Sequence, residues 1–104
     1  MNPPDIKDAL TNELTLKKLS LAFEELFNLP ALKYKLVRYR EEPTDTKFTV
    51  SLVLRAGKLT VDLTLSGPHI QGQFDWGLSK DKPVEVLGAN GTKTVFIKGY
   101  LRPA

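Results

Sequence analysis

Residues 48–65 read FTVSLVLRAGKLTVDLTL, and apolar residues alternate with mostly polar ones on both sides of Ala56-Gly57. Successive side chains of a strand point to opposite faces of a sheet, so a period of two indicates a half-buried strand. The alternation resumes after a glycine, which is typical of a tight turn. We therefore expect a hairpin of two strands here.

The apolar residues of this hairpin fall on one face if Ala56-Gly57 forms the turn. The expected cross-strand pairs are then Leu54/Leu59, Leu52/Val61, Val50/Leu63 and Phe48/Leu65. A shift of one residue would turn a whole set of apolar side chains to solvent, so burial fixes which face each side chain takes.

A helix is predicted upstream of this hairpin, ending before Asn28 and Pro30, because the residue before proline is disfavoured in helical geometry. Asp5 is an expected N-cap of a first turn, with Thr11 or Thr15 as alternatives. The helical segment carries apolar residues at spacings of three and four, which predict one buried stripe. Its members are Leu16, Leu19, Ala22, Phe23, Leu26 and Phe27.

A second apolar stripe is out of phase with the first. It consists of Ile6, Leu10, Leu14 and Leu21, which would project roughly opposite to the main stripe on one continuous helix. Two interpretations remain open. The helix breaks within residues 11–15 and its first part packs on the core, or the extra stripe binds a partner such as a second copy of the chain.

The segment 31–40 is predicted to be a strand with Leu32, Tyr34 and Leu36 facing inward, followed by Val37 and Tyr39 on the opposite parity. One extra residue in a strand reverses the facing of everything after it, so we expect a β-bulge here.

Further strands are predicted after Leu65. Residues 70–76 alternate and are expected to pair beside the hairpin, and Val84–Leu87 and Thr94–Ile97 flank Asn90-Gly91, a sequence that favours a type I′ turn. The expected pairs of this second hairpin are Val86/Val95 and Val84/Ile97.

These elements predict an α+β fold in which an N-terminal helix packs on one face of an antiparallel meander of five or six strands. The layout is similar to that of cystatin-like folds, by analogy of architecture only. We expect a single domain over residues 1–104, with residues 1–4 as a loose arm because of two prolines.

Composition excludes several classes of protein. The chain has no cysteine, so disulfides, thiolate metal sites and cysteine nucleophiles are absent. No apolar run is long enough to span a membrane and the N-terminal residues lack a signal-peptide pattern, so a cytoplasmic protein is expected.

The net charge is +3, and residues 32–58 carry seven Lys/Arg against three acidic residues, an excess of 7 − 3 = +4.

The sequence offers little that would support catalysis. His69 is the only histidine and follows Gly67-Pro68, as an exposed turn residue would. Asp62 and Asp75 could approach each other on neighbouring strands, but outward aspartates on strands are usually solvated. The glycines form no phosphate-binding motif. A non-enzymatic protein without cofactor or metal is therefore expected.

A protein–protein interaction module is the function we expect, acting as an adaptor, an inhibitor or a self-associating subunit. An apolar patch with a basic rim would bind another protein, including a second copy in a homodimer, with the cations steering an acidic partner. Trp76 is included because tryptophan is enriched at interfaces, although Phe74 and Trp76 could equally be core. The expected contacts are Leu10, Leu14, Leu21, Trp76, Lys33, Lys35, Arg38 and Arg40.

The alternative is a protein that binds single-stranded nucleic acid on the outer sheet face. Cations would contact phosphates and tyrosine would stack on bases. The expected residues are Lys33, Lys35, Tyr39, Arg55 and Lys58. A third interpretation is a ligand pocket between helix and sheet, lined by Phe23, Phe27, Phe48 and Trp76.

Overall fold

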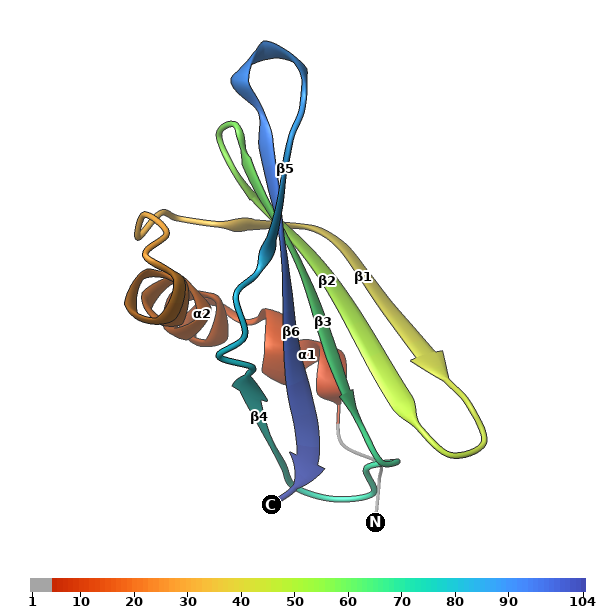
Figure 1. Ribbon diagram of the computed structural model, residues 1–104. Helices are drawn as coiled ribbons and strands as arrows, with labels where there is room; N and C mark the ends of the chain where they lie inside the picture. The colour runs from red at the N-terminus through yellow and green to blue at the C-terminus, as the bar shows by residue number, and fades with distance from the viewer. Residues whose placement is uncertain (1–4) are drawn as a thin grey trace.

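A computed structural model describes residues 5–104, and the expected arm at residues 1–4 lies outside the described residues. Within this range the chain forms two α-helices on one face of a six-stranded sheet (Figure 1), which confirms the α+β prediction. The elements are α1 (Ile6–Thr11), α2 (Glu13–Phe27), β1 (Lys35–Pro43), β2 (Phe48–Ala56), β3 (Leu59–Gly67), β4 (Phe74–Leu78), β5 (Val84–Leu87), a 3₁₀ turn η1 (Ala89–Gly91) and β6 (Lys93–Pro103).

The helical segment breaks at Asn12, as one of the two interpretations expected. The backbone N–H of Thr15 donates to Asn12 Oδ1 at 2.9 Å, and the Asn12 side-chain amide donates to the carbonyl oxygen of Asp8 at 2.9 Å. One side chain thus satisfies backbone groups at the end of α1 and at the start of α2. Asp5 caps α1, because its Oδ1 accepts from the N–H of Asp8 at 3.1 Å.

The break divides the second apolar stripe into a buried half and an exposed half. Ile6 and Leu10 turn toward the sheet and are buried, whereas Leu14 and Leu21 are 63% and 56% exposed. Leu10 is 1% exposed, so its prediction as a partner contact is wrong. The bend at Asn12 directs α1 onto the core, where Leu10 is packed among the buried residues.

The first hairpin has its apolar residues on the predicted face but pairs them differently. The turn is Gly57-Lys58, with Gly57 at φ 62°, and the pairs are Leu54/Val61, Leu52/Leu63 and Val50/Leu65. The difference from the prediction is two residues along one strand, which preserves parity. A positive φ at the first loop position suits glycine, which explains why Gly57 begins the turn.

The predicted bulge in β1 is confirmed, since the pairing with β2 shifts between Leu36 and Arg38. Val37 is left exposed, while Leu36 and Tyr39 pack against the core. Tyr39 therefore does not share a face with Lys35, and its prediction as a stacking platform on the outer face is wrong.

The sheet is not a meander. Its strand order is β1-β2-β3-β6-β4, with β6 parallel to β3 and antiparallel to both β4 and β5. Residues 68–73 carry the chain past the end of β6 to reach β4 (Figure 1). Strand β4 begins at Phe74, whereas the prediction began this strand at Ile70. The long strand β6 contributes the buried residues Val95, Ile97 and Leu101, so it takes the central position.

The second hairpin differs from its prediction by one residue. Val84 pairs with Phe96 and Val86 with Thr94, which places both valines on the outer face, away from the helices. Asn90 and Gly91 do adopt positive φ angles of 60° and 74°, but within the η1 turn rather than a two-residue type I′ loop.

The core lies between the helices and the inner face of the sheet. Phe23 is fully buried and its ring meets Tyr34 edge-on, with centroids 5.5 Å apart. Phe27, Phe48 and Trp76 pack against the same core. Of the four aromatic residues expected to line a ligand pocket, Phe23 therefore lies in the core and the other three are partly buried against it, and the pocket itself stays a prediction.

Candidate functional site

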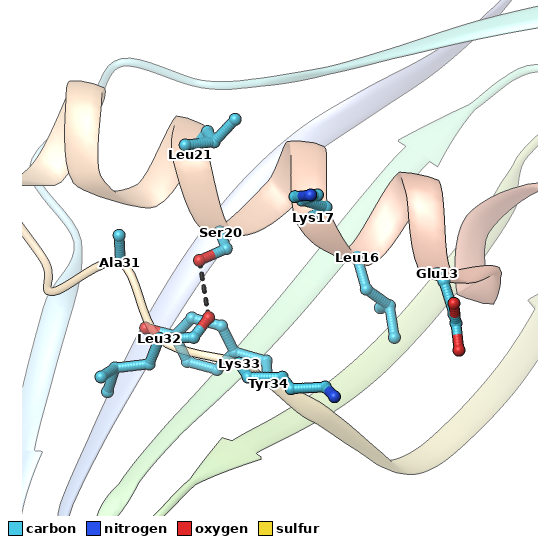
Figure 2. Close-up of a pocket in the computed structure, with 9 residues that line it drawn as sticks. All are labelled: Glu13, Leu16, Lys17, Ser20, Leu21, Ala31, Leu32, Lys33 and Tyr34. Carbon is cyan, nitrogen blue, oxygen red and sulfur yellow. Dashed lines mark hydrogen bonds between the residues drawn. The ribbon is translucent and has the colours of Figure 1, made fainter.

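A groove runs beside α2, and we call it the α2 groove. It forms because Asn28 ends the helix in the left-handed conformation, at φ 56°, and sends the chain back along the helix as an extended segment. The hydroxyl of Ser20 on α2 donates to the carbonyl oxygen of Leu32 at 2.7 Å and holds the two walls together (Figure 2). Leu29 anchors the returning segment in the core.

The α2 groove has a volume of about 530 Å³. Its apolar lining comes from both walls, namely Leu16 and Leu21 of the helix and Ala31 and Leu32 of the returning segment. Leu21 and Leu32 remain 56% and 38% exposed, so the groove presents apolar side chains to solvent.

Charged side chains flank the α2 groove. Lys17 lies on the helix wall and Lys33 on the opposite wall, with Glu13 at the helix start (Figure 2). The three charges sum to +1, and both lysines are exposed. Tyr34 also lines the groove, and burial raises the pKa of its phenol, which therefore stays uncharged.

The residues predicted to bind a protein partner are only partly brought together. Leu21 and Lys33 line the α2 groove. Leu14 is exposed near the start of the same helix and does not line the groove. Trp76 is partly buried against the core from the inner side of β4. Lys35, Arg38 and Arg40 lie on the outer face of β1, so the predicted basic rim does not surround the predicted leucines.

The outer face of the sheet, which neither helix covers, is a second candidate surface. Lys35 pairs directly with Arg55 across β1 and β2, and Arg38 follows on the same face after the bulge. Like charges directly opposite each other on neighbouring strands destabilise the pairing. Arg40 lies further along β1 and pairs with Glu42 at 3.2 Å. Lys58 lies apart from this strip, in the exposed β2–β3 turn.

Two exposed aromatic residues on this outer face escaped the sequence prediction. Phe96 and Tyr100 are 42% and 40% exposed on the central strand β6, with Lys98 between them. The Arg102 guanidinium lies over the Tyr100 ring, 5.2 Å from its centroid. The alternation of residues 93–103 carries the signal, because Val95, Ile97 and Leu101 are buried on the opposite parity.

The candidate catalytic groups are held apart. His69 Nε2 lies 2.6 Å from the carbonyl oxygen of Thr44, an exposed contact that links two loops. Asp62 and Asp75 are on the same face, but their partners on β6 are Phe96 and Arg102. Six residues of strand separate those partners, which is about 20 Å. The carboxylate pair considered from the sequence is therefore not formed.

Residues 5–104 contain no cluster of three or more histidine, cysteine, aspartate or glutamate side chains placed to hold a metal ion. In the same range, no helix has the length and apolar character needed to cross a membrane.

Comparison with protein-family models, with curated proteins and with solved structures finds no match to this chain. The cystatin-like layout therefore stays an analogy of architecture, and the parallel pairing of β3 with β6 differs from a simple meander.

Proposed function

We propose that this protein is a non-catalytic interaction module that docks a segment of another protein in the α2 groove. The observation that carries the proposal is an apolar groove, open to solvent, with a lysine on each wall. Contiguous exposed apolar patches can mark interaction sites, and Leu21 and Leu32 are exposed together on the two walls of this groove. The groove contains Leu21 and Lys33 from the set expected on sequence grounds.

The groove suits a partner segment that combines apolar and acidic side chains. Apolar side chains of the segment would contact Leu16, Leu21 and Leu32, while its carboxylates would pair with Lys17 and Lys33. Because these lysines are exposed, the charges contribute mainly to the rate of association and to specificity. The apolar contacts then provide most of the affinity.

Selection from a displayed library of acidic and apolar peptides tests this proposal. For the selected peptides, we expect Leu21→Asp to weaken binding at least about tenfold, because it places a carboxylate in the apolar groove. Leu14→Asp is the matched control, since Leu14 lies on the same helix and is exposed but does not line the groove. Equal weakening by both variants, or a library that yields no binder, would contradict the proposal.

Binding of single-stranded nucleic acid by the outer face is a second candidate, which Phe96, Lys98 and Tyr100 favour. Base stacking on aromatic side chains beside cations is a common mode of single-strand recognition. Titration with fluorescent oligonucleotides should show affinity that falls steeply with salt. Lys98→Glu should abolish binding, while Lys17→Glu, on the helix side, should retain it. No binding at low salt would eliminate this candidate.

A further inference from the structure

The β5–β6 hairpin carries a concentration of exposed apolar side chains. Figure 1 shows it extending past the helices at the top of the view. All four residues of β5 are exposed, and Leu87 reaches 79%. On the outer face, Val84 and Val86 adjoin Phe96. Neither helix covers these side chains.

The free edge of β5 presents hydrogen-bonding groups in a defined order. The N–H of Gly88 donates to the carbonyl oxygen of Thr92 at 2.9 Å, in the same alignment that pairs Val86 with Thr94. Hydrogen-bonded and non-hydrogen-bonded pairs alternate along an antiparallel ladder. Val84 and Val86 therefore bond to β6, and Glu85 and Leu87 direct their N–H and C=O groups to the free edge.

The opposite edge of the sheet is protected, whereas β5 is not. The edge strand β1 has a bulge after Leu36 and ends in Pro43, and its exposed side chains include the cations Lys35, Arg38 and Arg40. Charges, bulges and prolines are the usual means of preventing strand addition. The only charge on β5 is Glu85, and it forms an ion pair with Lys93 of the same hairpin at 2.7 Å.

We propose that a second copy of this chain pairs with β5, so that the two sheets join across a two-fold axis at Val86. Hydrogen bonding requires Glu85 and Leu87 of one copy to lie opposite Glu85 or Leu87 of the other. If Glu85 faces Glu85, like charges oppose each other and Leu87 faces Pro83, which has no N–H. If Leu87 faces Leu87, Glu85 falls opposite Ala89, which belongs to η1.

The alignment of Glu85 with Leu87 avoids each of these conflicts. Each such pair exchanges two hydrogen bonds, and Val86 faces Val86 across the axis. The outer-face patch of Val84, Val86 and Phe96 then continues into the same patch of the second copy. On the inner side, Glu85 lies opposite Leu87 of the second copy. Within that copy, Leu87 in turn pairs with Lys93 of β6. A second copy is the occupant because this edge is complementary to itself.

Cysteine cross-linking tests the pairing directly, because the chain has no cysteine of its own. Facing side chains of a non-hydrogen-bonded pair have Cβ atoms about 4.5–5.5 Å apart, close to the range in which a disulfide forms. Val86→Cys should therefore give a covalent dimer under mild oxidation. In the same alignment, two copies of Val84→Cys lie about 13 Å apart along the strand and should not cross-link.

A second control separates pairing from random collision. Val37→Cys places a cysteine at a position of similar exposure, 58% against 49% for Val86, on the opposite edge and reports the rate of collision. Sedimentation of the wild type over rising concentration should show dimers, and Val86→Lys, which opposes two lysines at the axis, should remain monomeric. A wild type that stays monomeric, a Val86→Cys rate no faster than Val37→Cys, or cross-linking of Val84→Cys instead would each overturn the proposal.

Discussion

Gly67 lies where β3 ends, and its missing side chain allows the backbone of β6 to approach closely. A Cβ atom added there would overlap the carbonyl oxygen of Leu101. Backbone cannot move aside as a flexible side chain can, so Gly67→Ala should destabilise the fold by about 2 kcal/mol or more. Gly72→Ala is the control, because its added Cβ meets open space and should change stability by less than about 0.5 kcal/mol. Urea denaturation of both variants measures the difference, and equal effects would contradict the packing argument.

Tyr34 and Tyr39 make the stability of the fold sensitive to alkaline pH. Burial raises the pKa of both phenols above the usual value near 10, and at Tyr39 a hydrogen bond to Glu41 and the charges of Glu41 and Asp5 raise it further. Both phenols then stay protonated in the folded chain at a pH where the unfolded chain ionises. Their contribution is complete below pH ~10 and decreases as the pH rises above it.

This dependence is measured by urea unfolding at about pH 8 and pH 10.5, on either side of the usual phenol pKa. We expect Tyr39→Phe to lose less of its unfolding free energy between these values than the wild type, because phenylalanine does not ionise. Lysines titrate in the same range in both proteins, so the comparison cancels their effect. Equal losses in the two proteins would show that Tyr39 does not contribute.

Asn12 joins the two helices by capping both. Asn12→Ala removes the acceptor for the Thr15 N–H and the donor to the Asp8 carbonyl oxygen, and should cost about 1–2 kcal/mol. Asn12→Asp keeps the acceptor at the start of α2 and loses only the donor, so its cost should be smaller. Thermal unfolding ranks the three proteins. If Asn12→Asp proves as destabilising as Asn12→Ala, the cap of α2 is not the important contact.

The buried face of a strand was more predictable from the sequence than the residues with which it pairs. A period of two in residues 48–65 identified the buried face of β2 and β3 correctly, because a shift of two residues does not change parity. For the same reason, parity alone could not locate the turn, which was predicted at Ala56-Gly57 and lies at Gly57-Lys58. Placing the second turn at Asn90-Gly91 shifted the predicted pairing by one residue, so Val84 and Val86 were paired with Ile97 and Val95 instead of Phe96 and Thr94.

The candidate sites were predictable in part for the same reason. The phase mismatch left two interpretations open, and only the position of the bend at Asn12 shows that Leu10 is buried while Leu14 and Leu21 stay exposed. The α2 groove depends on the chain reversal at Asn28 and on the hydrogen bond between Ser20 and Leu32, which lie 12 residues apart. Local periodicity contains no information on such pairings.

The strand order makes β6 indispensable to the fold. Neighbouring strands in the chain usually pair, which favoured a meander, yet β6 lies between β3 and β4 and contributes Val95, Ile97 and Leu101 to the core. A chain ended at Thr92 should therefore be unfolded by circular dichroism, because β3 and β4 lose their shared partner. Removing Ala104 alone, which forms one backbone hydrogen bond to Gln73, should leave the fold intact. A folded chain ending at Thr92 would contradict the central role of β6.

The direction of β6 also has a practical result. The molecule is elongated and measures 47 × 26 × 23 Å. Strand β6 begins in the β5–β6 hairpin at one end and runs to the C-terminus at the other end (Figure 1). A fluorescent reporter attached after Ala104 would emerge at the end remote from Val86. Labelled chains could then be titrated with unlabelled ones, and a rise in fluorescence anisotropy would report their association without the reporter blocking β5 or the α2 groove.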